Sequence, residues 1–446
     1  MTSKLRNIIA LYMAKFVMFG LKLFKRNGTS FPGKVALFID NSFLDVVNEK
    51  CNRIILITGT NGKTTTNNLI NHILKGNVIL SNLKGANMIN GLCSSYVKNT
   101  LDSYDYGIFE VDEGSLDHVG KYLEADYLIV TNFFRDQLDR YGEIERLIDE
   151  VYEDIKALPN CNLIINCDDP YVNQFKNKLD NSIVTFGLDV ESNKILETNL
   201  LLNKCPICSN KIVYNKHTYG HLGDYCCEVC GFNNKQKDFM VKDVKELSNS
   251  QLITITDNNN NEYEINYPYI GLYNAYNVCG VFALTQELGL DSKNVINSIQ
   301  NFSFSLGRME DFNYKNRIIK VILTKNPIGL SQVTRIISND TRKKTILHIL
   351  NDNMADGRDV SWIWDANTLC TNDETINKYY CSGRRSEDIA LKKKYDNVEI
   401  NKIHIINDMY KAIDEAIEDD VEIVYVLPTY TAIFETRDYI DKVVNK

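Results

Sequence analysis

The segment whose residue types point most directly to chemistry is a glycine-rich loop. Residues 59–66 read GTNGKTTT, follow the apolar run 53–58 and precede a helical pattern over 67–75. The apolar run is typical of a buried parallel strand. In such a strand, loop and helix, backbone amides surround phosphate oxygens, the lysine reaches the β- and γ-phosphates, and the next hydroxyl is placed for Mg²⁺. The predicted triphosphate site comprises Gly59, Thr60, Asn61, Gly62, Lys63, Thr64 and Thr65.

Three further apolar runs end in polar side chains. These are Glu110 at the end of 106–110, Asn132 after 127–131, and Asn166, Asp168 and Asp169 after 161–165. Because the carboxyl ends of parallel strands meet at one edge of a sheet, we expect these groups to surround one magnesium–nucleotide. Mg²⁺ prefers hard oxygen ligands, so Thr64 and Glu110 are the predicted magnesium ligands.

Two cysteine pairs form a second candidate site. CPIC at 205–208 and CEVC at 227–230 are separated by 18 residues, and this spacing is a strong signal for a four-thiolate zinc ribbon. Four thiolates leave no position for water, so we expect the metal to be structural and to supply the folding free energy of this short segment. Cys226 is a neighbouring alternative ligand. The predicted ligands are Cys205, Cys208, Cys227 and Cys230.

The chain as a whole has the composition of a globular protein. Its 446 residues are 44% hydrophobic and 24% charged. This length predicts about two to four domains, and the composition argues against disorder. The 50 basic and 58 acidic residues leave a formal net charge of −8, a poor match for non-specific nucleic-acid binding.

The first residues contain one stretch with two open interpretations. Residues 8–24 are rich in large apolar side chains, but Lys15 and Lys22 interrupt them, so we predict neither a membrane span nor a signal peptide. At helical spacing, one face carries Lys4, Lys15, Lys22 and Arg26, and another carries Ile9, Met13, Phe16 and Leu23. Such a helix lies on an anionic membrane or, in the commoner case, packs its apolar face on the next domain.

The C-terminal third alternates apolar runs with helical patterns. The runs are 318–324, 345–350, 402–406 and 422–427, and the helical patterns lie near 328–338, 385–395 and 407–418. This alternation predicts a parallel sheet with crossover helices. Trp362 and Trp364 follow one strand end, where they either pack in the core or form an interface with a partner.

The motifs together resemble the central ATPase domain of the Mur ligases and folylpolyglutamate synthases. The resemblance rests on GTNGKTTT, Glu110, TNFFRDQLD at 131–139 and the Asn-x-Asp-Asp element at 166–169. GLYNAYN at 271–277 is similar to the family's His-Asn-x-x-Asn element, with Tyr273 in place of histidine, and LGRME at 306–310 is similar to its Gly-Arg-x-Glu hinge. The resemblance implies that ATP activates a carboxylate as an acyl phosphate, which an amine attacks. The nucleotide contacts it implies are Asn274, Asn277 and Arg308.

The chain departs from that family pattern in two places. Where the usual members have an Asp-His pair, this sequence has Asp136-Gln137. Many members also carry a carbamylated lysine, for which Lys156 is the only counterpart here. Both departures concern a second metal site.

The ribbon narrows the resemblance to one branch of the family. A Mur-type ATPase core with a four-cysteine ribbon, and without an N-terminal UDP-sugar-binding domain, resembles the MurT subunits of lipid II isoglutaminyl synthase. SNLKGANMINGL at 81–92 and FPGKVAL at 31–37 add to this resemblance. It implies ATP-dependent amidation of the D-glutamate α-carboxylate in the lipid II stem peptide to D-isoglutamine, in cell wall peptidoglycan synthesis. It places the enzyme in the cytoplasm, at the inner face of the membrane.

A partner follows from the same resemblance. A GatD-type class I glutamine amidotransferase supplies ammonia in a heterodimer, and Asp356 is placed to complete that partner's Cys-His pair. Asp352 and Asp359 are its neighbouring alternatives. The predicted catalytic residues are Lys63, Glu110 and Asp356, and the expected cofactors are ATP, Mg²⁺ and Zn²⁺.

The predicted fold is α/β. A Mur ligase-like P-loop ATPase domain with an inserted zinc ribbon precedes a Rossmann-like α/β domain. We expect a lead-in with the amphipathic helix over 1–45, the ATPase domain over 46–305 with the ribbon at 203–232, and a partner-contacting domain over 306–446.

Two other functions use the same motifs. An amino-acid-adding ligase of the Mur, pseudomurein or folylpolyglutamate type would apply this ATPase chemistry with an amino acid in place of ammonia. A non-catalytic zinc-ribbon protein with a nucleotide switch would bind nucleic acid, which the acidic balance disfavours.

Overall fold

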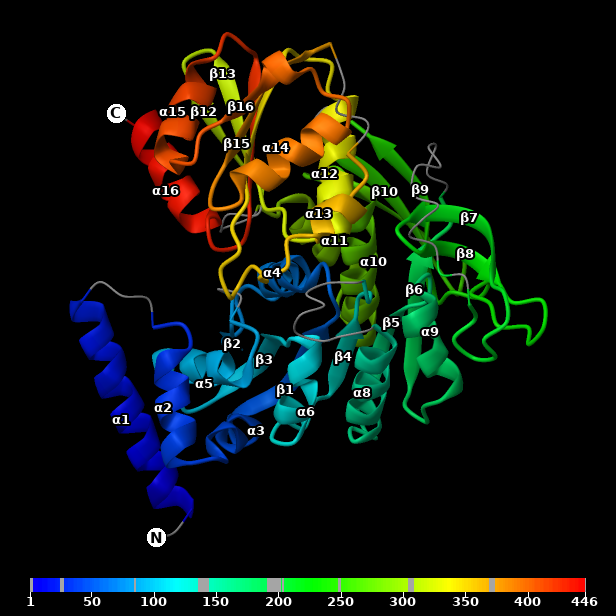
Figure 1. Ribbon diagram of the computed structural model, residues 1–446. Coiled ribbons are helices and arrows are strands. Elements are labelled where there is room, and N and C mark those ends of the chain that lie inside the picture. Colours follow the sequence, from blue (N-terminus) through cyan, green and yellow to red (C-terminus); the bar gives the residue numbers. More distant parts are fainter. Residues whose placement is uncertain are drawn as a thin grey trace. The chain divides into compact units, whose positions relative to one another are not determined.

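The described part of the chain forms two compact units. The computed structural model describes residues 3–24, 28–83, 86–134, 144–190, 202, 204–247, 250–303, 309–368 and 374–445. The boundary between the units falls between residues 302 and 303 (Figure 1). Each unit is built around its own sheet.

The first unit is built on a nine-stranded sheet. Its strand order is β11-β10-β9-β6-β5-β4-β1-β3-β2. The strands are β1 (Cys51–Thr58), β2 (Ile79–Ser81), β3 (Tyr104–Glu110), β4 (Tyr127–Val130), β5 (Asn162–Asn166), β6 (Ile183–Leu188), β9 (Phe239–Glu246), β10 (Gln251–Asp257) and β11 (Glu262–Tyr267). Adjacent strands in the part β9-β6-β5-β4-β1-β3-β2 of this order are parallel. The pairs β9–β10 and β10–β11 are antiparallel.

Strand β1 lies inside this sheet and is buried from Ile54 to Thr58. Its β-branched, uninterrupted apolar run suits a strand that is covered on both faces, which confirms the prediction of a buried parallel strand before the glycine loop. The register places Ile57 of β1 beside Glu110 of β3. The loop after β1 therefore starts next to the predicted magnesium carboxylate.

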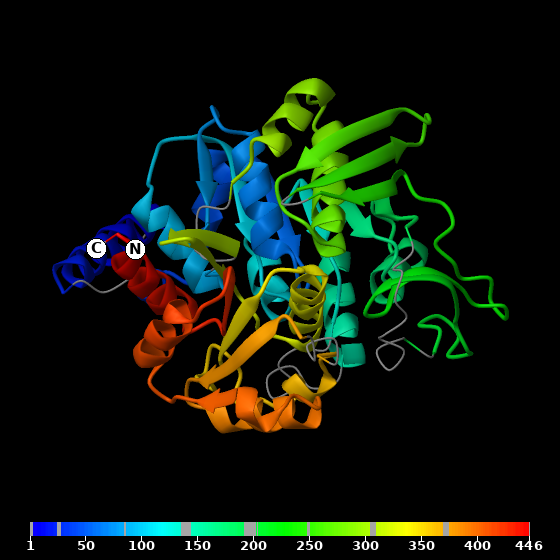
Figure 2. The same cartoon turned by 90° about the horizontal axis from the view of Figure 1, so that it is seen from above.

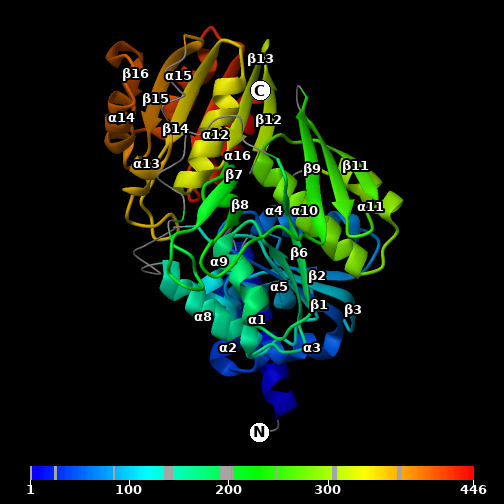
Figure 3. The same ribbon diagram turned by 90° about the vertical axis from the view of Figure 1, so that its right-hand side faces the viewer.

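Helices cover the sheet of the first unit and extend from it. They are α1 (Ser3–Leu23), α2 (Phe31–Ile39), α3 (Val46–Lys50), α4 (Lys63–Ile73), α5 (Ile89–Lys98), α6 (Leu116–Gly120), α8 (Ile144–Lys156), α9 (Pro170–Asn173), α10 (Leu272–Glu287) and α11 (Ser292–Gln300), with short 3-10 turns η1 (Phe43–Asp45), η2 (Glu113–Ser115) and η3 (Gln174–Asn177). Helix α10 is apolar on nearly all sides and packs on α4, β5, β6 and β9, and α11 lies against β11 (Figure 3).

The ribbon is an insertion between β6 and β9. It contains the antiparallel hairpin β7 (Val213–Tyr219) and β8 (Leu222–Cys226). In the described residues, the small apolar cluster of the ribbon holds Ile212, Tyr225 and Phe232 beside two of the cysteines, with Tyr214 packed against it. A core this small stabilises little by burial, so the segment depends on other bonds.

The second unit contains a six-stranded sheet in the order β12-β13-β17-β14-β15-β16. The elements are β12 (Met309–Tyr314), β13 (Arg317–Ile322), α12 (Pro327–Asn339), β14 (Lys344–Ile349), α13 (Trp362–Asp365), β15 (Ile376–Ser382), α14 (Ser386–Tyr395), η6 (Ile400–Lys402), β16 (Ile403–Ile405), α15 (Met409–Glu418), β17 (Ile423–Pro428) and α16 (Ile433–Val444). All pairs except β12–β13 are parallel. One apolar cluster includes residues of α15 and α16, and a separate one includes residues of α12. Figure 2 shows the ribbon of this unit in yellow, orange and red. The predicted Rossmann-like sheet is confirmed.

Candidate functional site

The loop after β1 adopts a conformation that its glycines make accessible. Gly59 and Gly62 have φ angles of +115° and +91°, which are strained for residues with a side chain. A Cβ on Gly59 would lie 2.7 Å from the carbonyl oxygen of Asn132, and one on Gly62 would collide with the amide of Asn277. Both glycines are therefore required by backbone conformation and by close approach.

Residues after β4 hold the loop in place. The Thr60 N–H donates to the carbonyl of Asn132 at 2.7 Å, and the Asn61 N–H donates to the Asn132 side-chain oxygen at 3.0 Å. The Thr131 hydroxyl donates to the Asn61 carbonyl at 2.8 Å. The sequence predicted that Asn132 lies beside the loop, and the structure brings the two together.

Helix α4 begins in the loop and buries polar side chains. Its residues from Lys63 to Asn68 are all buried although each carries a polar group. Burying polar groups costs free energy unless each finds a partner. A polar helix start that is buried in this way is typical of a ligand site, with its amides facing a bound anion.

Lys63 is the buried cation of this site. Its ammonium lies 2.7 Å from a carboxylate oxygen of Glu113 and also donates to the carbonyl of Gly59. Burial by itself lowers the pKa of Lys63, but the charges of Glu113, Asp112 and Glu110 outweigh burial and raise it. The lysine is therefore positively charged at neutral pH.

Thr64 and Glu110 form the hard-oxygen pair that the sequence predicted. The Thr64 hydroxyl donates to a carboxylate oxygen of Glu110, and Glu110 is only 1% exposed. A hydroxyl beside a buried carboxylate, at the point where a loop could present phosphate oxygens, fits the ligand chemistry of Mg²⁺. The donor set therefore suits a magnesium–nucleotide.

Asn274 and Asn277 lie at the start of α10, next to the loop. Asn274 is 1% exposed and donates to the carbonyl of Ile270 at 2.9 Å, while Asn277 approaches Gly62. Burial raises the pKa of Tyr273, at the position where the resemblance implies histidine, to about 12. Its hydroxyl is therefore neutral at pH 7 and cannot supply the charge of an imidazolium.

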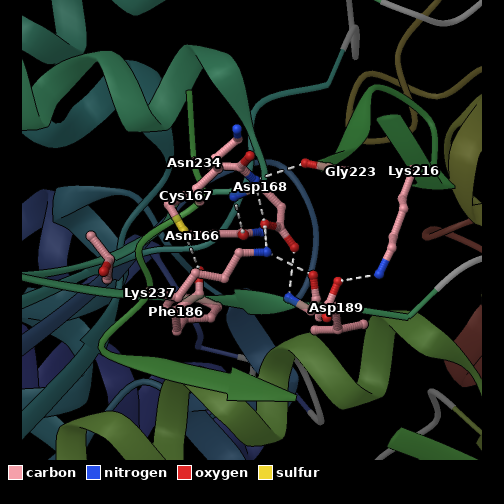
Figure 4. Close-up of polar contacts among 12 residues, drawn as sticks. Asn166, Cys167, Asp168, Phe186, Asp189, Lys216, Gly223, Asn234 and Lys237 are labelled. Carbon is pink, nitrogen blue, oxygen red and sulfur yellow. Dashed lines mark hydrogen bonds and ion pairs between the residues drawn. The ribbon is translucent and has the colours of Figure 1, made fainter. Parts of the chain in front are cut away.

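Asp168 does not face the loop, contrary to the prediction. It is fully buried and lies 2.5 Å from the ammonium of Lys237 (Figure 4). Its oxygens also accept hydrogen bonds from the side chains of Asn234, at 2.7 Å, and Tyr276, at 2.8 Å. Because these donors fill the carboxylate, Asp168 fastens the segment after the ribbon to β5 and α10.

Asp169 also serves the ribbon rather than a metal ion. One of its oxygens caps α9 at the N–H of Tyr171 (2.9 Å) and lies 3.0 Å from Nε2 of His221, at the tip of the ribbon hairpin. The other oxygen accepts from the N–H of Phe133 at 2.7 Å. The next residue, Phe134, donates to the Thr60 hydroxyl at 3.0 Å. The hairpin tip is thus linked to the glycine loop.

Lys156 lies away from this site. It occupies the last turn of α8, which returns to the start of β5, so it lies at the opposite edge of the sheet from the glycine loop. Its side chain is 59% exposed and pairs with Glu153 at 3.6 Å. The assignment of Lys156 as the counterpart of a carbamylated site lysine is therefore wrong. Asp136, Gln137 and Arg308 lie outside the described residues.

The four predicted zinc ligands come together. One sulfur from each lies within 4.8 Å of the others; the residues are Cys205, Cys208, Cys227 and Cys230. Each CxxC turn is closed by a backbone hydrogen bond. The Ser209 N–H donates to the carbonyl oxygen of Cys205 at 2.8 Å, and the Gly231 N–H donates to the carbonyl oxygen of Cys227 at 2.9 Å. Cys226 lies outside the cluster. Four converging thiols fit a structural Zn²⁺ ion.

Asp356 is held within the second unit. It is buried and accepts hydrogen bonds from the Thr431 N–H, at 2.7 Å, and the Thr431 hydroxyl. Burial raises its pKa, although the bonds from Thr431 oppose that effect. Asp352 pairs instead with Arg384 and Arg385 at 3.1 and 3.2 Å. Thus Asp356 has a fixed orientation that links the segment after β14 to the segment after β17.

The two tryptophans divide between the two predicted roles. Trp362 is packed against the apolar clusters of the second unit. Trp364 is 44% exposed and makes an edge contact with Tyr395 at 5.5 Å between ring centroids. Core packing therefore describes Trp362, and Trp364 remains a candidate interface residue.

Comparisons with known proteins agree with these features. Family models match residues 57–207 as a Mur ligase middle domain and residues 323–433 as a MurT ligase C-terminal domain. A solved pseudomurein peptide ligase type C from Methanothermus fervidus has the same fold, with a TM-score of 0.69 at 22% identity, over 92% of this chain and 84% of that one. The chain is thus a Mur ligase-type protein.

Full-length relatives narrow the class. The subunit MurT of lipid II isoglutaminyl synthase (glutamine-hydrolyzing) from Staphylococcus aureus strain COL is 32% identical over 432 residues, 96% of both chains. The Streptococcus pneumoniae R6 subunit of the same name is 32% identical over 92% of both chains. The chain belongs to the MurT family, which confirms the resemblance seen in its motifs.

Proposed function

We propose that this chain is the synthetase subunit of an ATP-dependent amidoligase that converts the D-glutamate α-carboxylate of the lipid II stem peptide to D-isoglutamine. The observation that carries the proposal is family membership along nearly the whole chain, to subunits whose names specify lipid II and glutamine hydrolysis. The buried Lys63 and the Thr64–Glu110 pair supply a chemical basis for the ATP-dependent step.

The reaction has two bond-forming steps. A carboxylate oxygen of the acceptor attacks the γ-phosphorus of ATP, the bond to the bridging oxygen breaks, and ADP leaves. Ammonia then attacks the acyl carbon, the C–O bond to phosphate breaks with its electron pair on phosphate, and a proton leaves the nitrogen. The chain contributes positioning and charge rather than a covalent intermediate on a side chain.

Lys63 and the loop amides would hold the triphosphate. With nucleotide bound, the Lys63 ammonium would offset charge at the phosphoryl group being transferred. Thr64 and Glu110 would hold Mg²⁺, which supplies charge neutralisation at the phosphates when bound. Asn274, Asn277 and Arg308 would contact the rest of the nucleotide.

The cysteine cluster would hold a structural zinc ion. Its four thiolates complete the coordination, so zinc takes no part in the transfer steps. In this proposal residues 46–305 form the ATPase domain with the ribbon at 203–232.

A glutamine amidotransferase of the GatD type would supply ammonia. We propose that residues 306–446 contact it in a heterodimer and that Asp356 completes its catalytic Cys-His pair. The support is the orientation of Asp356 by Thr431, together with relatives named as subunits of a glutamine-hydrolysing enzyme. We propose that the complex works in the cytoplasm, at the inner face of the membrane, where ATP and a lipid-linked acceptor would both be within reach.

The test is reconstitution of the chain with its amidotransferase. Lipid II, ATP and glutamine are supplied, and the stem peptide is examined by mass spectrometry for replacement of one carboxyl by an amide. The proposal expects amidation with glutamine or with ammonium chloride. Ligation of a free amino acid, without amidation, would instead identify an amino-acid-adding ligase.

A further inference from the structure

Helix α1 attaches to the first unit by one side. Its small residues Ala10 and Ala14 are fully buried, and α1 packs on α2 and α5 (Figure 1). The Arg6 guanidinium donates to the carbonyl of Ile39 at 2.7 Å, which fixes the helix near the end of α2. The helix is therefore a docked element with a defined outer side.

That outer side is apolar and exposed. Two of its aromatic residues, Phe16 and Phe19, are 72% and 61% exposed. The exposed apolar side chains along the helix are Leu5, Ile8, Ile9, Tyr12, Met13, Phe16, Phe19 and Leu23. They include every residue of the apolar face predicted from the sequence, so the interpretation in which that face packs on the next domain is wrong.

Basic residues accompany this apolar face. Residues 1–39 contain five lysines and two arginines and no acidic residue, whereas the whole chain has a net charge of −8. Lys4, Lys15 and Lys22 lie at spacings of 11 and 7 residues, which places them along one flank of the exposed face. Lysines at such a flank can extend their ammonium groups to headgroups while their stems cover apolar surface.

We propose that the exposed face of α1, defined by the eight apolar residues above and flanked by these lysines, binds the surface of an anionic lipid bilayer. The helix then lies in the plane of the interface, with its aromatic side chains among the acyl chains and its lysines at anionic headgroups. This inference rests on the proposed function insofar as a lipid-linked acceptor gives the enzyme a reason to reach the membrane.

Charge and length favour this occupant over the alternatives. A second copy of the same face would bring two sets of lysines together, which is unfavourable, whereas anionic headgroups complement them. In the described residues, none of the helices has the length and apolar character of a transmembrane segment. A helix at the membrane interface places its apolar side chains among acyl chains and its lysines beside anionic headgroups.

Membrane binding has a defined kinetic consequence. Docking concentrates enzyme and lipid-linked acceptor on one surface, so it lowers the KM for that acceptor. It does not alter the chemistry at the glycine loop. Loss of docking should therefore raise the KM for lipid II in vesicles and leave the turnover of a water-soluble stem-peptide acceptor unchanged.

The test is co-sedimentation of the full-length chain, alone and with its amidotransferase, with phosphatidylcholine vesicles that contain or lack phosphatidylglycerol. We expect binding to the anionic vesicles that weakens with added salt. Phe16→Ser/Phe19→Ser should reduce binding at least about tenfold, because the variant lacks two large apolar side chains whose transfer from water into the bilayer stabilises the bound state. Lys15→Glu/Lys22→Glu should reduce binding to anionic vesicles specifically.

The matched control is Leu101→Ser/Ile400→Ser, which removes two apolar side chains of 51% and 70% exposure elsewhere and should bind like the wild type. Wild-type protein that ignores anionic vesicles overturns the proposal, and so does a Phe16→Ser/Phe19→Ser variant that binds normally. Conversion of a dimer to a monomer by that variant, without vesicle binding by the wild type, would assign the face to a second copy. A complex that amidates neither lipid II nor the soluble stem peptide would refute the proposed function. Vesicle binding is measured without turnover, so it tests the membrane proposal independently.

Discussion

Lys63 is the residue on which the nucleotide site depends most. It is the buried cation among Glu110, Asp112 and Glu113, and it sits where the chain turns from β1 into α4. Its identity and role could be proposed from the sequence because strand, loop and helix are contiguous. Glu113 lies just behind Glu110 in the sequence, but no local pattern indicates that it, rather than Glu110, pairs with Lys63.

The first prediction concerns Lys63→Ala. Removing the ammonium takes away charge stabilisation at the transferred phosphoryl group, so we expect kcat for amidation to fall by about 10²-fold or more. Zinc content should be unchanged. The measurement is initial-rate kinetics of the reconstituted complex.

Lys156→Ala is the matched control for that experiment, because this exposed lysine lies at the opposite edge of the sheet. It should keep wild-type activity. A Lys63→Ala enzyme that retains amidation would contradict the site, and a damaged Lys156→Ala enzyme would restore Lys156 to it.

A second residue-scale prediction follows from His348. It is fully buried in β14, and burial, with a smaller effect from Lys393, lowers its pKa to about 3. The unfolded chain has an ordinary histidine pKa of about 6.5, so below that pH the unfolded state binds a proton that the folded state excludes. Stability from this group is therefore present above about pH 6.5 and is lost as the pH falls towards the folded-state pKa.

The measurement is the free energy of unfolding of the wild type and of His348→Leu at about pH 7 and about pH 5. The wild type should lose about 2 kcal/mol more than the variant over this interval. Equal losses in the two proteins would show that His348 is protonated in the folded state.

Elements were predictable where their signals are local. The continuous apolar run of β1 and the alternation of the second unit identified strands correctly. Strand β15 was missed because polar residues interrupt INKYYCS, although Ile376 and Tyr379 are buried. Asp168 and Asp169 were misplaced because their partners, His221 and Lys237, lie in or after the ribbon, more than 50 residues along the chain.

The ribbon gives the prediction at the scale of elements. Its hairpin tip contacts Asp169 through His221; Asp169 accepts from the N–H of Phe133, and the next residue, Phe134, donates to the hydroxyl of the loop residue Thr60. Removing zinc with a chelator that leaves magnesium should therefore lower the melting temperature and also weaken binding of a non-hydrolysable ATP analogue. Calorimetric titration and thermal melting measure the two effects.

Cys205→Ser should reproduce both changes without a chelator. Cys226→Ser is its control, since Cys226 lies outside the thiol cluster and its loss should spare zinc content and affinity. Loss of zinc with unchanged melting would remove its structural role. Lower melting with unchanged nucleotide affinity would show that the hairpin does not support the loop.

At the scale of the whole molecule, the proposed reaction needs a second subunit that supplies ammonia. Family membership extends along both units, and Asp356 in the second unit is oriented by Thr431. The sequence suggested the partner only through resemblance, because no local pattern specifies a carboxylate that acts in another subunit. The burial of Asp356 and its hydrogen bonds from Thr431 could be seen only in the folded structure.

Asp356→Asn tests this relation between subunits. The substitution keeps the size of the side chain but removes its charge, so glutamine hydrolysis by the complex should fall at least about tenfold. ATP-analogue binding by this chain should not change. Asp359→Asn, at an exposed neighbour that caps Ser361, is the control and should hydrolyse glutamine normally. A normal rate in Asp356→Asn would move the contact elsewhere.

The most direct measurement of the central claim is oxygen transfer during amidation. Lipid II labelled with ¹⁸O in the D-glutamate α-carboxylate is incubated with the complex, ATP and glutamine, and the released phosphate is analysed by mass spectrometry. An acyl phosphate predicts one labelled oxygen in the phosphate for each amide formed. Amidation that yields only unlabelled phosphate would contradict it.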